Sequence, residues 1–494
     1  MKRLYVLTMS FLLSLIVVNA QNETDALRYA QIFPTSTARS SGMGGAFSAF
    51  GADFSALSIN PAGIGVYRSS EFTVTPSMDY SMTSTQYLGQ KSDDNTSTFF
   101  LGNLGFVYSH LTGKQKGLVG INFGIGYNRE KNFSNSTIMQ GVNQSSSYLD
   151  DFAYWADGTK SEDLYEFKEG LAWDVYMLDT VNGQPLNYET VFSMWGDNPS
   201  SIYGQTQRRI LETTGGIGEY VFSLGFNLGN MLYFGGTFGI HSLNYNQHMR
   251  HYEKDETGTI QEFDFFTFDE WLNASGTAYS FKLGILLKPI QLLRIGAAVH
   301  FPYSYKIKEN YNTYMKGAFD TPVDGVTEYE SESPLSDYRY GLETPLKAVG
   351  NVGIQIAKFA LIGVDVEYVD YTSMKLKNGS DGYDFYDENQ SINNAYRSVL
   401  NFRAGAEFRF WMMKFRVGAA YYESPYTETE VNNDANYLNF TGGLGFRDEH
   451  FFFDLAYVYS EHRERYFMYQ YPPAEAAVID FSKHNLMATI GFRF

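Results

Sequence analysis

Few side chains in this sequence have the types and spacing that chemistry needs. His248 and His251 lie three residues apart, and Glu253 follows. Zinc ligands can have this spacing, but the segment reads as a strand end running into a loop, and no second ligand cluster accompanies it. No Ser/His/Asp arrangement stands out either. We therefore expect no metal, no cofactor and no enzymatic activity.

A second group of charged residues recurs at every other position of predicted strands. If it lined a lumen, it could form a pore, a catalytic cluster or a ladder of ion pairs that holds the wall together, and we favour the ladder. Some of its arginines could also meet a carboxylate ligand. The group comprises Lys282, Arg294, Asp365, Glu367, Arg403, Glu407, Arg409, Arg416, Asp454 and Arg493.

The elements that must position these charges are long alternating strands. In residues 399–410, apolar side chains alternate with Asn401, Arg403, Glu407 and Arg409. The same period of two recurs along residues 486–494. One face suits lipid, and the other carries charges of both signs with glycines between them. This pattern predicts an all-β fold, an antiparallel transmembrane β-barrel.

Fourteen strands are expected, an even number as in bacterial outer-membrane barrels. Tight connections alternate with long polar ones, which places both termini on the side of the short turns, in the periplasm. The predicted strands span 70–88, 97–110, 116–130, 214–228, 230–247, 274–288, 291–308, 338–356, 359–376, 394–409, 412–424, 435–447, 449–466 and 482–494. The long loops between them are 89–96, 131–213, 248–273, 309–337, 377–393, 425–434 and 467–481.

The longest predicted loop, 131–213, is unusually aromatic. It could fold over the mouth of the barrel and form an apolar groove for a hydrophobic ligand, or it could pack on itself as a cap without a ligand. The residues expected to line such a groove are Phe152, Trp155, Phe167, Trp173 and Trp195.

Composition and the chain ends agree with export to the outer membrane of a Gram-negative bacterium. Residues 1–20 read as a signal peptide, with Lys2 and Arg3 before an apolar run and a small-residue cleavage site. Cysteine is absent, and the formal net charge of −18 argues against nucleic acid as a partner. The closing Phe494 resembles the signal that the barrel assembly machinery reads. We expect contacts with outer-membrane lipid and lipopolysaccharide, and a monomer.

Residues 21–69 precede the first predicted strand of the barrel, which occupies 70–494. Their centre, 40–65, is Gly-rich and poor in charge, as expected of a plug, or hatch, inside the lumen. The residues expected to build and gate this hatch are Gly42, Gly44, Gly45, Asp53, Asn60, Pro61 and Ala62. The glycines permit close packing, and Pro61 restricts the backbone of Asn60.

The stretch from Ser41 to Ser48, with Asp53 and Asn60-Pro61-Ala62, resembles the N-terminal hatch of the FadL-type channels. That resemblance implies passive uptake of long-chain fatty acids or aromatic hydrocarbons, gated by the hatch. It also implies a kinked third strand through which ligand leaves sideways. Here Gly120, Asn122, Gly124 and Gly126 share one face of that strand. The alternative for these glycines is that they only make room for the hatch.

Other functions remain open at this point. Eight histidines and 39 tyrosines permit a haem or porphyrin receptor without indicating one. FadL-like barrels also serve type IX secretion in some bacteria, so a non-transporting barrel is the alternative of a different class. Such a barrel would act as a secretion shuttle or an adhesin.

Overall fold

The computed structural model describes residues 22–33, 37–194, 202–323, 325–472 and 474–494. The predicted signal peptide therefore lies outside the described residues. One large antiparallel sheet closes on itself, because β1 pairs with β2 on one edge and with β21 on the other. Within the described residues, no helix is long and apolar enough to cross a membrane.

The wall contains fourteen strand passes, which confirms the predicted count. Ten passes are continuous: β1 (Glu71–Tyr87), β2 (Gln90–Leu111), β7 (Thr206–Leu228), β8 (Leu232–Lys254), β9 (Phe263–Leu287), β17 (Ser398–Phe410), β18 (Met413–Tyr422), β19 (Tyr437–Arg447), β20 (Phe451–Tyr466) and β21 (Ala477–Arg493). Four are interrupted: β3 (Leu118–Asn132) with β4 (Asn135–Val142), β10 (Leu293–His300) with β11 (Ser304–Val323), β13 (Ser336–Glu343) with β14 (Lys347–Ile356), and β15 (Ala360–Asp370) with β16 (Lys375–Lys377).

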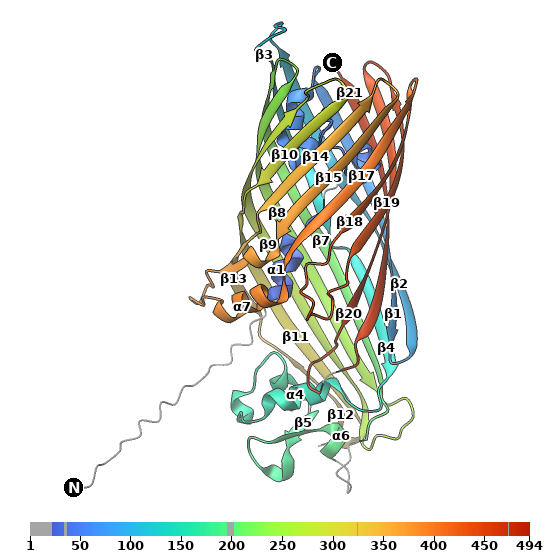
Figure 1. The fold of residues 1–494 in the computed structure, drawn as a ribbon. Coiled ribbons are helices and arrows are strands. Elements are labelled where there is room, and N and C mark those ends of the chain that lie inside the picture. Colours follow the sequence, from blue (N-terminus) through green and yellow to red (C-terminus); the bar gives the residue numbers. More distant parts are fainter. Residues whose placement is uncertain (1–21, 34–36, 195–201, 324, 473) are drawn as a thin grey trace, which may run out of the picture.

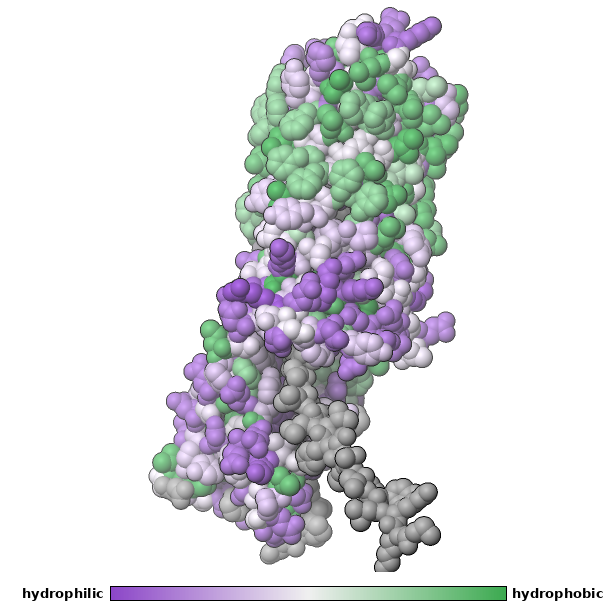
Figure 2. Space-filling model, turned by 90° about the vertical axis from the view of Figure 1, so that its left-hand side faces the viewer, coloured by the Kyte–Doolittle hydropathy of each residue, from purple (hydrophilic) through white to green (hydrophobic). Residues whose placement is uncertain are grey.

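The strands alternate as the sequence predicts, and their outward apolar side chains form a belt. On β8 and β9 the belt includes Phe234, Phe238, Phe281 and Ile285, all exposed. The belt occupies the upper part of the molecule, whereas the lower part is mostly hydrophilic (Figure 2). A closed barrel with such a belt satisfies its backbone internally and can span a membrane.

The two ends of the barrel differ. Apart from the β1–β2 turn, the short turns lie at the same end as the C-terminus, and we call it the turn end (Figure 1). At the opposite cap end, β7, β8, β9 and β11 run on past the belt and carry a layer of helices and short strands. The helices and short strands between β4 and β7 are α4 (Tyr148–Ala156), η2 (Ser161–Asp163), α5 (Glu169–Asp174), β5 (Leu178–Thr180), η3 (Val181–Gly183), β6 (Tyr188–Thr190) and α6 (Val191–Met194). β12 (Val326–Glu332) pairs antiparallel with the end of β11 there. η4 (Tyr371–Ser373) and α7 (Tyr386–Ala395) lie beside the barrel mouth.

Several predicted loops are wrong because the strands continue beyond the membrane. Residues 89–96 are not a long loop: β1 and β2 are joined by a tight turn at Leu88 and Gly89, both with positive φ. The predicted loops 248–273 and 309–337 are largely strand, and the 131–213 loop shortens to 143–205. Polar residues in these segments indicate contact with water, not the end of strand pairing.

Candidate functional site: the hatch and the lumen

The lumen is filled by the N-terminal segment before β1. Its helices are α1 (Glu23–Ala30), α2 (Ala38–Ser41), α3 (Ala56–Ile59) and η1 (Pro61–Val66), which lie inside the barrel (Figure 1). Asn22 begins α1 with a capping box, its side chain accepting from the backbone of Thr24 and Asp25. Lys131 of β3 donates to the carbonyls of Arg28 and Gln31, each at 2.9 Å, and ties the end of α1 to the wall.

The middle of the hatch lies on a row of glycines. Gly353, Gly363, Gly405 and Gly418 belong to β14, β15, β17 and β18, and each is paired directly with the next. A Cβ at Gly405 or Gly418 would collide with the backbone of Met43, and one at Gly363 with the carbonyl of Ala46. We call these four residues the first glycine track. It lets hatch backbone touch wall backbone directly.

A second glycine track supports the Asn60-Pro61-Ala62 motif. Gly225, Gly235 and Gly284 are paired across β7, β8 and β9. A Cβ at Gly235 would collide with the carbonyl of Pro61, and one at Gly284 with the Asn60 side chain. Asn60 is fully buried, and its Oδ1 accepts from the backbone of Ala62 at 3.1 Å. The motif therefore forms a fixed corner seated on the wall.

The other predicted hatch residues stabilise the segment from within. Asp53 is buried and accepts hydrogen bonds from the Thr37 hydroxyl (2.6 Å) and the Ser55 hydroxyl (2.7 Å). Gly44 and Gly45 have φ of 65° and 78°, which favour glycine. The carbonyl of Gly42 accepts from Thr441 of β19 at 3.1 Å. The structure thus brings all seven predicted hatch residues together inside the lumen.

Sequence reasoning missed the polar residues that attach the hatch to the wall. Arg39 pairs with Glu407 at 3.1 Å, and Ser58 donates to Glu219 at 2.7 Å. Ser48 donates to Asp365. The wall partners were among the predicted inward charges or on the same alternating faces, but nothing in the sequence indicates which hatch residue meets which strand.

The inward charges form ion-pair networks, as the ladder interpretation requires. Arg403 pairs with Glu367 at 3.3 Å, and Arg416 lies 2.7 Å from both Glu407 and Asp454. These side chains are almost completely buried. Breaking one such pair leaves an uncompensated charge, so the network fixes the wall and the hatch in one arrangement.

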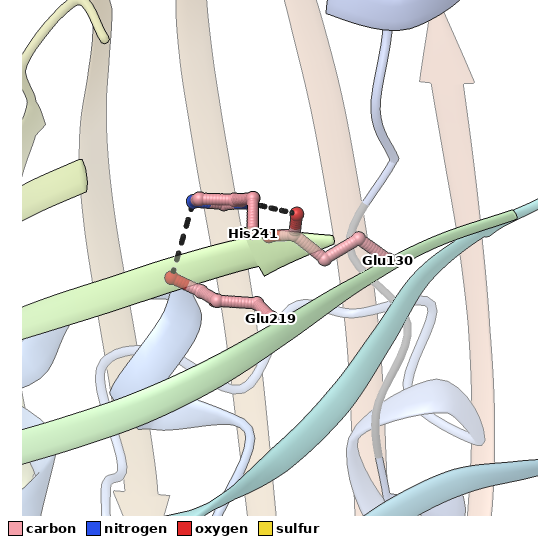
Figure 3. A group of neighbouring side chains, drawn as sticks. All are labelled: Glu130, Glu219 and His241. Carbon is pink, nitrogen blue, oxygen red and sulfur yellow. Dashed lines mark hydrogen bonds and ion pairs between the residues drawn. The ribbon is translucent and has the colours of Figure 1, made fainter. Parts of the chain in front are cut away.

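One cluster has the ligand types of a metal site. Glu130, Glu219 and His241 approach one another in the lumen (Figure 3). His241 Nδ1 lies 2.9 Å from Glu130, and Lys282 Nζ lies 2.6 Å from Glu219 and 3.7 Å from Glu130. The ammonium group already lies between the two carboxylates and supplies the positive charge that a metal ion would supply. The cluster therefore fits the ion-pair ladder better than a metal centre.

The His248, His251 and Glu253 spacing does not form a site. His248 stacks on Trp271 and bonds Asp269 at 2.7 Å, whereas His251 is buried and bonds Glu253 at 2.9 Å. Glu253 also accepts from the Ser147 hydroxyl and the Tyr148 backbone. Its oxygens are therefore committed to hydrogen bonds within the cap.

The barrel wall is continuous at β3, where the resemblance to FadL-type channels implies a side opening. β3 is paired with β2 from Gly120 to Asn128, and with β7 along the same stretch. A Cβ at Gly124 would crowd Leu57 and Ile64, and one at Gly126 would collide with Phe54. Asn122 donates to the carbonyls of Ile64 (2.7 Å) and Tyr67 (3.1 Å). In this conformation Gly124 and Gly126 make room for the hatch and Asn122 holds it, as the alternative interpretation expects, whereas a Cβ at Gly120 would meet wall residues alone.

A cavity of about 50 Å³ lies between the hatch and the wall. Its lining includes Ile59, His241, His300 and Phe301. It borders the breaks at 301–303 and 344–346, where β10 gives way to β11 and β13 to β14. This volume suits a few water molecules rather than a long hydrocarbon. With the hatch in place, the described lumen has no room here for a larger ligand.

The aromatic residues predicted to line a ligand groove do not form one shared surface in the described structure. Phe152 is fully buried in one core with Phe263, Phe266 and Phe268 of the neighbouring strand region. Phe167 packs on Tyr311, Trp173 packs on Tyr188, and Trp155 is 41% exposed beside Tyr471. Trp195 lies outside the described residues. The aromatic side chains mostly build a self-packed cap, the second interpretation considered for this loop.

The cap should lose stability as pH rises. Burial raises the pKa of Glu169 to about 7 and that of Asp150 to about 6. The folded cap then holds more protons than the unfolded cap between about pH 3.8 and 7, so its free energy of unfolding falls across that window. For Glu169 the loss is up to about 3.5 kcal/mol, at about 1.4 kcal/mol per pKa unit.

Urea titration followed by tryptophan emission checks this, since three of the five tryptophans (155, 173 and 195) lie in the cap segment. The midpoint should be lower at pH 8 than at pH 5, and Glu169→Gln should remove most of that difference. The exposed neighbour Glu166 offers a matched control. An equal flattening in Glu166→Gln would contradict the assignment to Glu169.

Together, these observations define a transmembrane β-barrel plugged by its own N-terminal segment. No sequence-family model matches the chain, and no curated protein sequence matches it. Solved structures do share its fold. A Pseudomonas aeruginosa FadL homologue superposes with a TM-score of 0.56 at 13% identity, covering 94% of this chain and 99% of that one.

Two hydrocarbon transporters are similar as well. The P. putida toluene transporter TodX gives a TM-score of 0.54 at 12% identity, with 93% of this chain and 99% of that chain covered. The Ralstonia pickettii toluene transporter TbuX gives 0.50 at 15% identity, with the same coverage of 93% and 99%. The predicted resemblance to the FadL-type barrels is therefore confirmed at the level of the fold.

Proposed function

We propose that this protein is an outer-membrane channel for passive uptake of hydrophobic small molecules, gated by its hatch. The observation that carries the proposal is the seating of Met43–Ala46 and Asn60–Ala62 on two glycine tracks of the wall. These contacts close the lumen. Most of them involve hatch backbone, and the Phe50 ring and the Ile64 side chain also lie against the tracks. Structures with this fold include toluene transporters and a FadL homologue, which fits the substrate class of long-chain fatty acids or aromatic hydrocarbons.

Passage requires the hatch to move. The cavity of about 50 Å³ beside it is far smaller than such ligands. A shift of the hatch off either track would widen the lumen while the barrel stays closed. In this proposal the turn end and the C-terminus lie in the periplasm and the cap lies outside the cell, as in other barrels with short periplasmic turns. The first described helix, α1, lies nearer the cap end, because it packs on α7 and its Glu23 carbonyl accepts from Tyr396.

Uptake into liposomes tests the proposal. Purified barrel is reconstituted, and entry of labelled palmitate or labelled toluene is compared with entry of a polar sugar. Faster entry of a hydrophobic probe is expected, and Asn60→Ala should change its rate because the corner on the second glycine track loses its cap. Rates equal to those of protein-free liposomes for both hydrophobic probes would contradict the proposal.

The cap favours one other function. It has a hydrophobic core of its own with α4, α5 and the extended strands, which is more structure than a simple channel mouth needs. A secretion shuttle or adhesin would use such a layer to bind protein. In that case the barrel would co-purify with a secreted or surface protein and would transport neither hydrophobic probe.

A further inference from the structure

A wide basin opens at the turn end of the barrel. It encloses about 510 Å³, and positively charged side chains dominate its lining. The lining residues are Arg39, Lys358, Phe359, Glu407, Arg409, Trp411, Lys414, Arg447 and Arg493. We call this cavity the basic basin. Six of these side chains are cationic and one is a carboxylate, in a chain whose formal net charge is −18.

The carboxylates around the basin are fewer than the cations, and each of two carboxylates contacts more than one cation. Glu407 alone contacts Arg39 (3.1 Å), Arg409 (2.8 Å) and Arg416 (2.7 Å). In the same way, Asp454 contacts both Arg416 and Arg447, at 2.7 and 3.2 Å.

The remaining cations add to this excess. Arg493 has Glu71 at 2.8 Å, and Lys414 donates to the carbonyl of Trp411 at 2.6 Å. Among the described residues, the ion pairs of the six lining cations and Arg416 involve three carboxylates: Glu407, Asp454 and Glu71. Positive charge therefore remains unneutralised around an open cavity, where it attracts anions.

The chemistry of the lining favours phosphate. Guanidinium groups present two parallel donors to a phosphate or carboxylate, and lysines add point charges. A phosphate group presents more acceptor oxygens to several cations at once than a carboxylate does. Inorganic phosphate or a phosphate monoester can also carry two negative charges, whereas the phosphodiester of a lipid headgroup carries one. The rim also bears Trp411 and Phe359, which are 87% and 71% exposed. Aromatic side chains at this level lie where a membrane headgroup region is expected.

We propose that the basic basin binds a phosphate group, supplied either by a soluble phosphate compound or by the headgroup of a membrane lipid. This inference is independent of the uptake proposed above, since it concerns the opposite side of the hatch from the cap. Because Arg39 belongs to the hatch, a bound phosphate would contact the hatch as well as the wall.

Two titrations of the full mature chain test this and distinguish the sources. Inorganic phosphate is titrated calorimetrically into the barrel in a non-ionic detergent, with acetate at equal ionic strength as the comparison. In the second arm, short-chain phosphatidylglycerol replaces inorganic phosphate. The test variant is Lys358→Gln/Lys414→Gln, because neither lysine pairs with a carboxylate in the described ion pairs and the Glu407 network stays intact.

We expect saturable binding in at least one arm, weakened roughly tenfold in the test variant, which corresponds to about 1.4 kcal/mol. The matched control is Lys91→Gln/Lys160→Gln, which removes the same charge from exposed positions near the cap end and should bind as the unchanged chain does. Binding only in the second arm assigns the phosphate to a lipid. Equal binding of acetate, equal weakening in both double variants, or no binding in either arm would overturn the proposal.

Discussion

Gly405→Leu/Gly418→Leu should displace the hatch and open the barrel to ions. These two glycines face each other on the first glycine track, and a Cβ at either would collide with the backbone of Met43. Backbone atoms cannot move aside as the end of a side chain can. Two leucines therefore prevent the hatch from packing against β17 and β18. Single-channel recording in a planar bilayer should show a mean conductance raised by roughly tenfold or more, since an emptied lumen of this size conducts.

A control variant in the same sheet distinguishes release of the hatch from the general effect of placing a leucine in a wall strand. Gly350 of β14 points outward, and a Cβ there would meet nothing within 4 Å. Gly350→Leu should therefore fold, insert and remain closed. If both variants stay closed while the heat-sensitive mobility of a folded barrel is retained, the first track does not hold the hatch.

The alternation in the sequence was enough to predict the wall. A period of two survives in every pass because one face meets lipid and the other meets the lumen, so the fourteen strands and the inward charges such as Arg403 and Glu407 could be identified without a structure. The Gly-rich segment was predicted as a hatch for a similar local reason: it is too small and flexible to be a wall strand.

Register and strand length could not be predicted in the same way. The glycine tracks exist only because the pairing register of successive wall strands places Gly363, Gly405 and Gly418 opposite one another. Strand extension past the membrane was missed because polar residues occur equally in loops and in solvated strands. The aromatic residues around Phe152 form a buried core. Their sequence pattern is the same as that expected for a ligand groove, so the sequence could not distinguish the two.

Glu407→Gln should be the most destabilising single change in the ion-pair network. Its carboxylate is 1% exposed and contacts three guanidinium groups, from Arg39, Arg409 and Arg416. Removing the charge leaves three cations crowded in a buried site. Loss of one partner from a buried pair costs about 3–5 kcal/mol, and we expect a loss of this size in the free energy of unfolding by urea in detergent micelles.

Removing one of the cations should destabilise the protein less than removing the Glu407 carboxylate, and this difference makes the prediction specific. Arg39→Gln leaves Glu407 with two cationic partners, so a loss of about 1–2 kcal/mol is expected. In the double variant, Arg39→Gln should recover part of the Glu407→Gln loss, because it removes one of the crowded cations. Asp480→Asn, which breaks the exposed pair with Arg463, is the control and should change stability by less than about 1 kcal/mol. Equal losses for Arg39→Gln and Glu407→Gln would show that crowding of the guanidinium groups is not what makes Glu407 necessary.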